Sequence, residues 1–244
     1  MDVGRRFVKV LARDGRDEDA DPDLLPERLV RAAAAVLSVD GAGLSVHGMP
    51  DLRTPLAASS DLAATAEALQ FTAGRGPCML SAESRLPVFA TEEQLANRWP
   101  VFHDLLVTHT PLRSVLALSL PGRLRGTGEM DLYFTDPDGP AVIDVDEARC
   151  VAELVSAQLA PAADWSAWTR SSAPEWPNTS AARRRSELWM AVGTVILALH
   201  VPPADALALL RGHAYATDRT VDELAADLID RRVDPDELQE DGHR

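Results

Sequence analysis

The stretch that most constrains the fold runs from 188 to 229, where apolar residues recur at helical spacing in three short runs. Pro203 suits the first turn of the second helix, because its missing N–H is not needed there. Thr220 and Glu223 form a capping box, which predicts that a third helix begins at 221. The stretch therefore predicts three helices packed through apolar faces, namely Leu188, Ala191, Val192, Val195, Ile196 and Leu199; Ala206, Leu207, Leu210 and Ala214; and Val221, Leu224, Ala225, Leu228 and Ile229.

Composition limits the classes of function. The chain has 244 residues and a net charge of −14, and 46% of it is hydrophobic but only 5% aromatic. This length suits one large domain or two smaller ones. The acidity argues against a general nucleic-acid coat protein, since binding to the phosphate backbone depends on positive charge. The charge is uneven, however: 181–220 carries five arginines against three acids, and 221–244 carries three against nine. A basic face followed by an acidic tail is typical of selective RNA binding.

The C-terminal pattern extends over about fifty residues. It consists of Ala191-x-Gly193, Ala206-x-x-x-Leu210-Arg211-x-x-Ala214, Arg219 and Leu224-Ala225. This pattern resembles the ANTAR module, the RNA-binding domain of bacterial antitermination regulators. The resemblance implies an exposed basic face that contacts small hairpin loops. The family usually has a lysine where this chain has Val192, so that basic contact is absent.

Five side chains are candidates for RNA contact. Arg183 and Arg184 open the module beside Arg185, where a charge run is either a phosphate contact or a solvated face. Arg211 lies just past the apolar stripe, and Arg219 precedes the third helix, whose positive end favours anions. Tyr215 is expected either to stack on a loop base or to pack on the edge of the bundle. The set is therefore Arg183, Arg184, Arg211, Tyr215 and Arg219.

The N-terminal part alternates strand and helix patterns. Charged, irregular residues 1–20 are expected to form a poorly ordered arm. The patterns that follow predict an α+β domain with an antiparallel sheet covered by helices. Strands are expected at 41–46, 54–59, 86–89, 113–120 and 128–134. A helix is expected to open at Asp23 or Pro26 and to end near 38–40, a short helix to follow the 74–78 loop, and further helices to lie at 62–71, 99–108 and 144–159.

Seven motifs fall in order along this part: Gly41-Ala42-Gly43-Leu44-Ser45-Val46, Leu56-Ala57-Ala58-Ser59, Leu69-Gln70, Gly74-x-Gly76-Pro77-Cys78, Arg98-Trp99-Pro100-x-Phe102, Arg113-Ser114-Val115-Leu116-Ala117-Leu118 and Leu132-Tyr133. Together they resemble a GAF domain of the kind that precedes ANTAR modules in actinobacterial regulators. The resemblance implies a sensory or dimerisation domain with a ligand pocket. Candidate pocket residues are Leu44, Phe71, Leu116 and Leu132, whose aliphatic character predicts no tight binding of nucleotide or haem. Glu129-Met130-Asp131 departs from the family pattern, and polar Asp131 changes what binds beside that strand.

Other chemistry is weakly supported. Cys78 and Cys150 have neither disulfide nor metal spacing, which indicates reduced thiols. Cys78 with His103 or His109 lacks a third orienting group, so no catalysis is expected, and the two histidines lack ligand spacing for a metal or haem. The glycine-rich turn at 74–77 lacks the lysine that ends a phosphate loop. We therefore expect no metal and no cofactor.

The sequence predicts four segments: a GAF-like domain at 22–160, a connector at 161–180 with Trp165, Trp168 and Trp176, an ANTAR-like domain at 181–232 and an acidic tail at 233–244. No signal or membrane-spanning pattern is present, so a cytoplasmic protein is expected. It is expected to be a non-enzymatic antitermination regulator that stabilises tandem RNA hairpins as a homodimer, with 165–176 and 144–159 as the interface and an unknown small molecule on the GAF-like domain. The alternative is a sensory or protein-interaction module whose helical end only dimerises. A third, enzymatic reading as a thiol reductase lacks the necessary cysteines.

Overall fold

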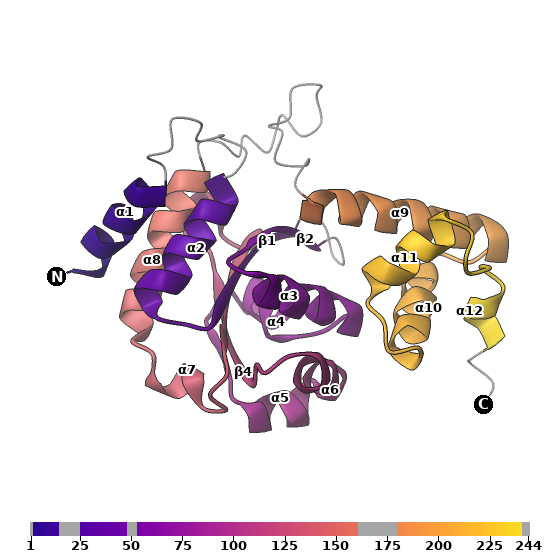
Figure 1. Ribbon diagram of the computed structural model, residues 1–244, viewed down its shortest axis with the longest axis horizontal. Helices are drawn as coiled ribbons and strands as arrows, with labels where there is room; N and C mark the ends of the chain where they lie inside the picture. The colour runs from indigo at the N-terminus through magenta and orange to yellow at the C-terminus, as the bar shows by residue number, and fades with distance from the viewer. Residues whose placement is uncertain (1, 15–24, 48–52, 161–179, 241–244) are drawn as a thin grey trace.

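A five-stranded antiparallel sheet forms the centre of the N-terminal part in this computed structural model (Figure 1). The structure describes residues 2–14, 25–47, 53–160 and 180–240, without the side chains of 14, 47, 54, 180–185, 239 and 240. The strand order is β2-β1-β5-β4-β3. The strands are β1 Gly41–His47, β2 Arg53–Ala58, β3 Val88–Ala90, β4 Ser114–Ser119 and β5 Gly128–Phe134.

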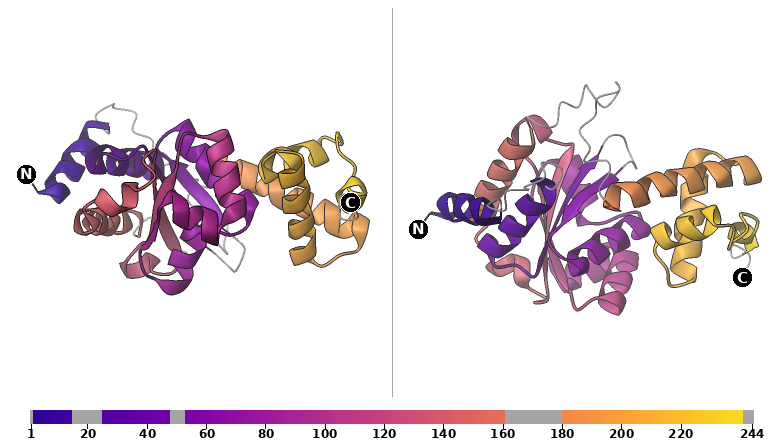
Figure 2. Two further views of the ribbon diagram at one scale, coloured as in Figure 1. Left: turned by 90° about the horizontal axis from the view of Figure 1, so that it is seen from below. Right: turned by 45° about the horizontal axis from the view of Figure 1, so that its top comes forward.

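Helices cover both faces of this sheet (Figure 2). One face carries α2 Leu25–Leu37 and α8 Val145–Leu159, and α1 Val3–Asp14 packs on these two helices. The other carries α3 Asp61–Ala73, α4 Pro77–Ser84, α5 Glu92–Arg98 and α6 Pro100–His109. Two short turns, the 3-10 helix η2 Gly122–Leu124 and α7 Gly139–Val142, join the last elements. The predicted α+β architecture, an antiparallel sheet flanked by helices, is confirmed, and residues 2–160 are called the sheet domain below.

The expected disordered arm is wrong for most of its length, because residues 3–14 form α1. Val3 and Phe7 are buried in the core shared with α2 and α8, and Val10 and Leu11 pack against it. These positions follow the helical i, i+4, i+7, i+8 spacing, while the charged residues between them face outward. Arg6 also pairs with Glu147 of α8 at 2.6 Å. The apolar stripe of α1 therefore packs this charged segment against α2 and α8.

In the described range 180–240, four helices follow the sheet domain: α9 Ser180–Leu199, α10 Pro203–Ala216, α11 Val221–Ile229 and α12 Glu237–Glu240. The three helices expected from the apolar runs are present, with Pro203 in the first turn of α10 and the Thr220–Glu223 capping box formed at α11. Their apolar faces share one buried cluster, except that Ile229, expected on the third face, is 39% exposed. Leu238 of α12 joins it, so the acidic tail is packed in part. These helices are called the helical bundle below; the tryptophan-bearing segment 165–176 lies outside the described residues.

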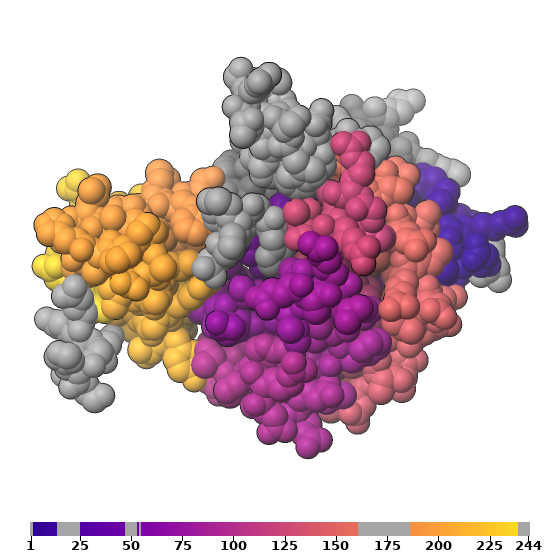
Figure 3. Space-filling model, turned by 180° about the vertical axis from the view of Figure 1, so that it is seen from behind, coloured from indigo at the N-terminus to yellow at the C-terminus, as the bar shows by residue number. Residues whose placement is uncertain are grey.

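The bundle packs against one end of the sheet domain (Figure 3). α10 and α11 lie against α3, and α9 reaches the edge strand β2. The link between the two is Phe71 of α3, which belongs to the apolar cluster of the bundle rather than to the core of its own domain. The bundle therefore takes one large side chain from the sheet domain to complete its core.

Candidate functional site

Arg211, the first candidate for RNA contact, faces the sheet domain. Its Nε donates a hydrogen bond to the backbone carbonyl of Phe71 at 3.2 Å. Its Cζ lies 4.8 Å from the centre of the Phe71 ring, so the guanidinium also makes a cation–π contact. A contact of this kind at a partly exposed site contributes about 0.5–1 kcal/mol. Arg211 therefore belongs to the interface between bundle and sheet domain, which we call the docking interface.

Tyr215, the second candidate, also lies in the docking interface. Its hydroxyl donates to Asp104 of α6 at 3.0 Å, although the side chain is 42% exposed. Two residues after the end of α10, an oxygen of Asp218 lies 2.9 Å from Nε2 of His109. The contacts of Tyr215 and Asp218 therefore both join the bundle to α6, in the same interface as the buried Phe71. In this arrangement the hydroxyl of Tyr215 is held by the sheet domain, and the rest of its side chain stays partly exposed.

The other basic candidates lie elsewhere. Arg219 pairs with Asp227 of α11 and donates to the carbonyl of Glu223 at 3.1 Å, so it braces its own helix. The side chains of Arg183 and Arg184 fall outside the described residues. Val192, which stands where the ANTAR pattern has a lysine, is buried in the bundle core. The structure therefore brings only Arg211 and Tyr215 together, and it does so against α3 and α6.

The four expected pocket residues do not line a common cavity. Leu44, Leu116 and Leu132 point to the face of the sheet that α2 and α8 cover, where they are fully buried. Phe71 lies on the opposite side, in the bundle cluster. Neighbouring residues of a strand alternate between faces, so these three leucines share a face with one another but not with α3. The pocket is corrected accordingly: the α3 face of the sheet is lined by the alternate residues.

Those alternate residues form a buried polar cluster. Arg53 of β2 pairs with Glu67 of α3 and, at 3.3 Å, with Asp131 of β5. The hydroxyl of Tyr133 donates to Glu67 at 2.6 Å, and Gln70 donates to Asp131 at 3.0 Å. All five side chains are at most 3% exposed. A charged network of this kind is stable only when each member has partners, because removing one leaves an uncompensated buried charge.

Two glycines make room for this cluster. A Cβ on Gly43 of β1 would lie 2.1 Å from the Glu67 carboxylate, and one on Gly76 would lie 2.4 Å from the Gln70 side-chain oxygen. That same oxygen accepts a hydrogen bond from the backbone N–H of Cys78, at the start of α4. Both glycines belong to the motifs that resemble a GAF domain. Their physical role is the close approach of α3 side chains to backbone.

Glu129 adds a third carboxylate beside a single arginine. It is fully buried on β5, and neither of its side-chain oxygens makes a hydrogen bond of regular geometry. Burial raises the pKa of Glu129 from 4.5 to about 7, although nearby Ser81 and Ser119 lower it somewhat. Burial, followed by repulsion from Glu67, also holds the pKa of Asp131 well above its usual range. Glu129 therefore titrates close to neutral pH within this cluster.

The helices on the α3 face of the sheet also carry Cys78, His103 and His109, the side chains considered for catalysis. Cys78 is completely buried, and burial raises the pKa of its thiol well above the usual value, which disfavours the nucleophilic thiolate. His103 and His109 face Glu92 and Asp218 respectively, at 3.6 and 2.9 Å. Within the described residues no group of three histidine, cysteine or acidic side chains is placed to hold a metal ion.

One sequence signal for the polar cluster was available. Glu67 and Gln70 lie three residues apart on one side of α3, and Glu129, Asp131 and Tyr133 alternate along β5. Only Asp131 was singled out as polar beside the pocket. Arg53 was missed because a single arginine at the start of a strand has the composition of a turn.

No family model matches the chain, and no curated protein does. Solved structures are similar over about two thirds of it. The GAF domain of a phosphoenolpyruvate-protein phosphotransferase from Coxiella burnetii is 16% identical with a TM-score of 0.43, covering 67% of this chain and 98% of that one. The corresponding GAF domain from Acinetobacter is 11% identical with a TM-score of 0.44, covering 66% and 92%. The nlh2 GAF domain from A. aeolicus, in an inactive state, is 9% identical with a TM-score of 0.44, covering 65% and 94%.

No single helix among the described residues is long and apolar enough to cross a membrane. Ser186–Leu199 and Pro203–Ala216 meet the length and composition criterion only as a pair, and the two segments bend by 107° at the break between them.

Proposed function

We propose that this chain is an RNA-binding antitermination regulator whose GAF-like sheet domain holds its ANTAR-like bundle in a docked state. The observation that supports this proposal is that Arg211 and Tyr215 make their hydrogen bonds to the sheet domain. Both side chains have the chemistry for RNA, a guanidinium for phosphate and a ring for base stacking. Both are engaged instead by Phe71 and Asp104 of the sheet domain. Docking and RNA binding by these residues are mutually exclusive.

Docking combines the burial of Phe71 with polar contacts that are individually weak, and we infer that it is reversible. Its polar contacts comprise the two made by Arg211 and Tyr215, the His109–Asp218 pair and a backbone hydrogen bond to Thr72. Each contributes on the order of 1 kcal/mol. A phosphate is a stronger partner for a guanidinium than a neutral carbonyl is, so a hairpin loop competes for Arg211. A signal that loosens α3 or α6 then releases the bundle to the transcript.

The proposed action is binding without turnover. The released bundle holds hairpins in nascent mRNA, which prevents formation of the terminator hairpin. One bundle offers few cations in an acidic protein, so a homodimer on two adjacent hairpins supplies the missing affinity. The apolar side of α8, which the sequence placed at a dimer interface, packs on α1, α2 and the sheet within the chain. Its outer side and segment 165–176 stay candidates for that interface.

The exposed side of α9 favours a second candidate function. Met190 and Leu197 are seven residues apart, which puts them on the same side of the helix, and they are 57% and 76% exposed. Exposed apolar residues in register on a helix are typical of helix pairing. The alternative is therefore a sensory or interaction protein whose bundle dimerises through α9 and binds no RNA.

A gel shift on two-hairpin RNA tests the proposal. Asp104→Ala removes the partner of Tyr215 from the sheet-domain side of the docking interface, without changing any candidate RNA contact. It is expected to bind RNA several-fold more tightly than the unchanged protein. Glu93→Ala, on exposed α5, controls for the loss of one negative charge. Adding Arg211→Ala to Asp104→Ala should abolish the gain.

Two results contradict the proposal. If Asp104→Ala and Glu93→Ala bind equally, docking does not regulate RNA binding. If no variant binds hairpin RNA and Met190→Asp dissociates a dimer, the dimerisation alternative replaces it.

A further inference from the structure

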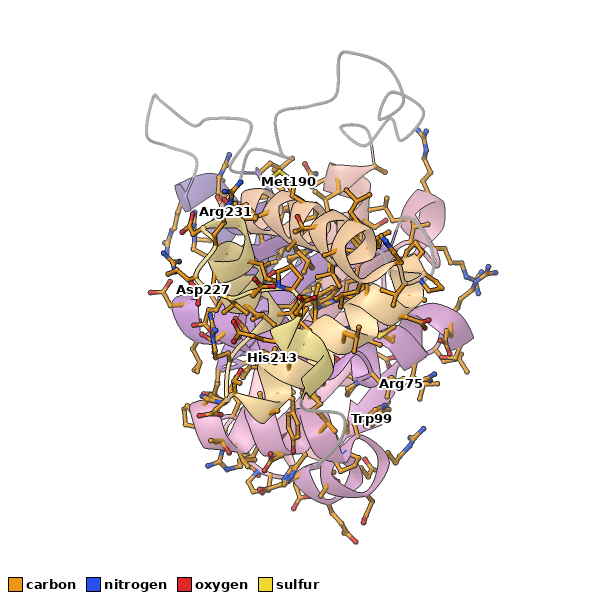
Figure 4. The ribbon with its side chains drawn as sticks, turned by 90° about the vertical axis from the view of Figure 1, so that its right-hand side faces the viewer. Arg75, Trp99, Met190, His213, Asp227 and Arg231 are labelled. Atoms are coloured by element: carbon orange, nitrogen blue, oxygen red, sulfur yellow. The ribbon has the colours of Figure 1, made fainter. Side chains whose placement is uncertain are left out.

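A shallow groove lies beside the docking interface, where α3 ends and α4 begins. It has a volume of about 300 Å³ and is bordered by the 74–76 turn, α4 and the α5–α6 junction. Arg75 and Trp99 both line it, and Figure 4 labels them on the side of the molecule that carries the bundle. Its size is at the lower end of small-molecule sites. Neither the sensing nor the RNA-binding role described above uses this groove.

Two arginines give the groove a positive charge. Arg75 and Arg98 are both exposed, and no carboxylate among the described residues pairs with either. Glu83 is the only acid in the lining, and it lies beyond pairing distance of both. In contrast, Arg6, Arg53, Arg113, Arg219 and Arg232 all have acidic partners. Two arginines without an acidic partner therefore face one groove, in a chain with a net charge of −14.

The groove is also partly preorganised. The guanidinium of Arg98 lies 4.6 Å from the ring centre of Trp99, a cation–π contact that fixes the direction of an otherwise mobile side chain. Trp99 in turn packs against two buried apolar clusters and caps the start of α6. Met79 and Leu80 of α4 add a half-buried apolar surface. A ligand that matches has an anionic group and an apolar or planar body.

We propose that this groove binds a small phosphate ester, with the phosphate between Arg75 and Arg98 and the ligand body over Met79 and Leu80. Arginine suits phosphate because its planar fork donates two parallel hydrogen bonds. The site does not depend on RNA binding and goes beyond it. The groove also lies next to Arg211 of the bundle, which gives it a regulatory role. Gly74 lines one end of the groove, and a Cβ on Gly74 would lie only 3.2 Å from the Arg211 side chain. An anion bound there attracts Arg211 and favours the docked bundle.

Calorimetry and thermal unfolding of the full chain test the site at constant ionic strength. The probes are inorganic phosphate, adenosine 5′-monophosphate and adenosine. The monophosphate is expected to bind and raise the unfolding temperature, inorganic phosphate to bind more weakly, and adenosine not to bind. Arg75→Gln and Arg98→Gln are each expected to weaken monophosphate binding about tenfold, the usual effect of losing a charged hydrogen bond. Arg123→Gln, at another exposed arginine, is the matched control and should bind normally.

Several results would contradict the proposed phosphate-ester site. Absence of binding by either phosphate probe overturns it, as does equal weakening by all three substitutions. If the monophosphate fails to bind while Arg75→Gln and Arg98→Gln weaken the RNA gel shift, the groove is part of an RNA surface instead. A gel shift that is absent in every protein, alongside arginine-dependent phosphate binding, rejects the antitermination proposal and leaves the groove intact.

Discussion

The hydroxyl of Thr72 on α3 accepts a hydrogen bond from the backbone N–H of Val221, at 3.0 Å, in the buried part of the docking interface. Val221 is the first residue of α11, where backbone N–H groups lack partners within the helix. The Thr220 side chain satisfies the N–H of Glu223, and the sheet domain satisfies that of Val221. One end of a bundle helix is thus capped partly by another domain.

Thr72→Val is expected to weaken docking, because a similar side chain without the acceptor leaves a buried N–H unpaired. The cost is about 1–3 kcal/mol. Hydrogen exchange should show faster exchange at the Val221 amide. Thr65→Val, whose hydroxyl bonds only within α3, is the control and should leave that amide protected. Unchanged exchange in Thr72→Val would mean that the contact does not hold the bundle.

Glu129→Gln is expected to change the pH dependence of stability. The pKa of Glu129 is about 7 in the fold and 4.5 ordinarily, so between these values the native state binds more protons than the unfolded chain does. The free energy of unfolding therefore falls as pH rises through this window, by up to about 3 kcal/mol. Glutamine has no proton to lose, so the variant should match the unchanged protein at pH 4.5 and exceed it at pH 8.

Urea unfolding at several pH values measures this difference. Glu93→Gln, at an exposed acid, should reproduce the pH profile of the unchanged protein. A Glu129→Gln profile parallel to that of the unchanged protein would show that Glu129 is not the titrating group.

Gly43→Ala is expected to destabilise the sheet domain severely, because the new Cβ would overlap the Glu67 carboxylate and break its pairing with Arg53. Loss of one partner in a buried charge pair costs about 3–5 kcal/mol. Gly193→Ala is the matched control, since a Cβ there meets nothing within 4 Å on α9. It should stabilise the helix by about 1 kcal/mol. Equal unfolding midpoints for both variants would contradict this account.

Arg211→Ala is expected to weaken binding to two-hairpin RNA and to flatten its dependence on salt, while circular dichroism stays unchanged. The physical reason is the loss of one phosphate contact and the counterions that it releases. The unchanged protein should bind two-hairpin RNA roughly a hundredfold more tightly than one-hairpin RNA, since pairing raises the effective concentration. Equal affinity for both RNAs would exclude a dimeric antiterminator.

Local features followed from the sequence because their causes are local. Proline at 203 and the capping box at 220–223 depend on residues within one turn, and both appear where expected. Strand β5 was predicted at 128–134, and the structure has it there. Helix α5 was not predicted, although Thr91 and Gln94 form a capping box of the same kind at its start. The 3.6-residue and 2-residue periodicities are set by chain geometry, so a pattern of apolar residues reveals them.

Tertiary structure decided which face of each element meets which neighbour. Both faces of the sheet are covered, so the apolar alternation of Leu44 and Leu132 gave no sign that Glu129 and Asp131 are buried as well. Nor did any local pattern show that Phe71 completes the core of the bundle, or that Arg211 and Tyr215 turn toward α3 and α6. These contacts join residues more than a hundred positions apart. They depend on how whole domains pack, which the periodicity of a single segment does not encode.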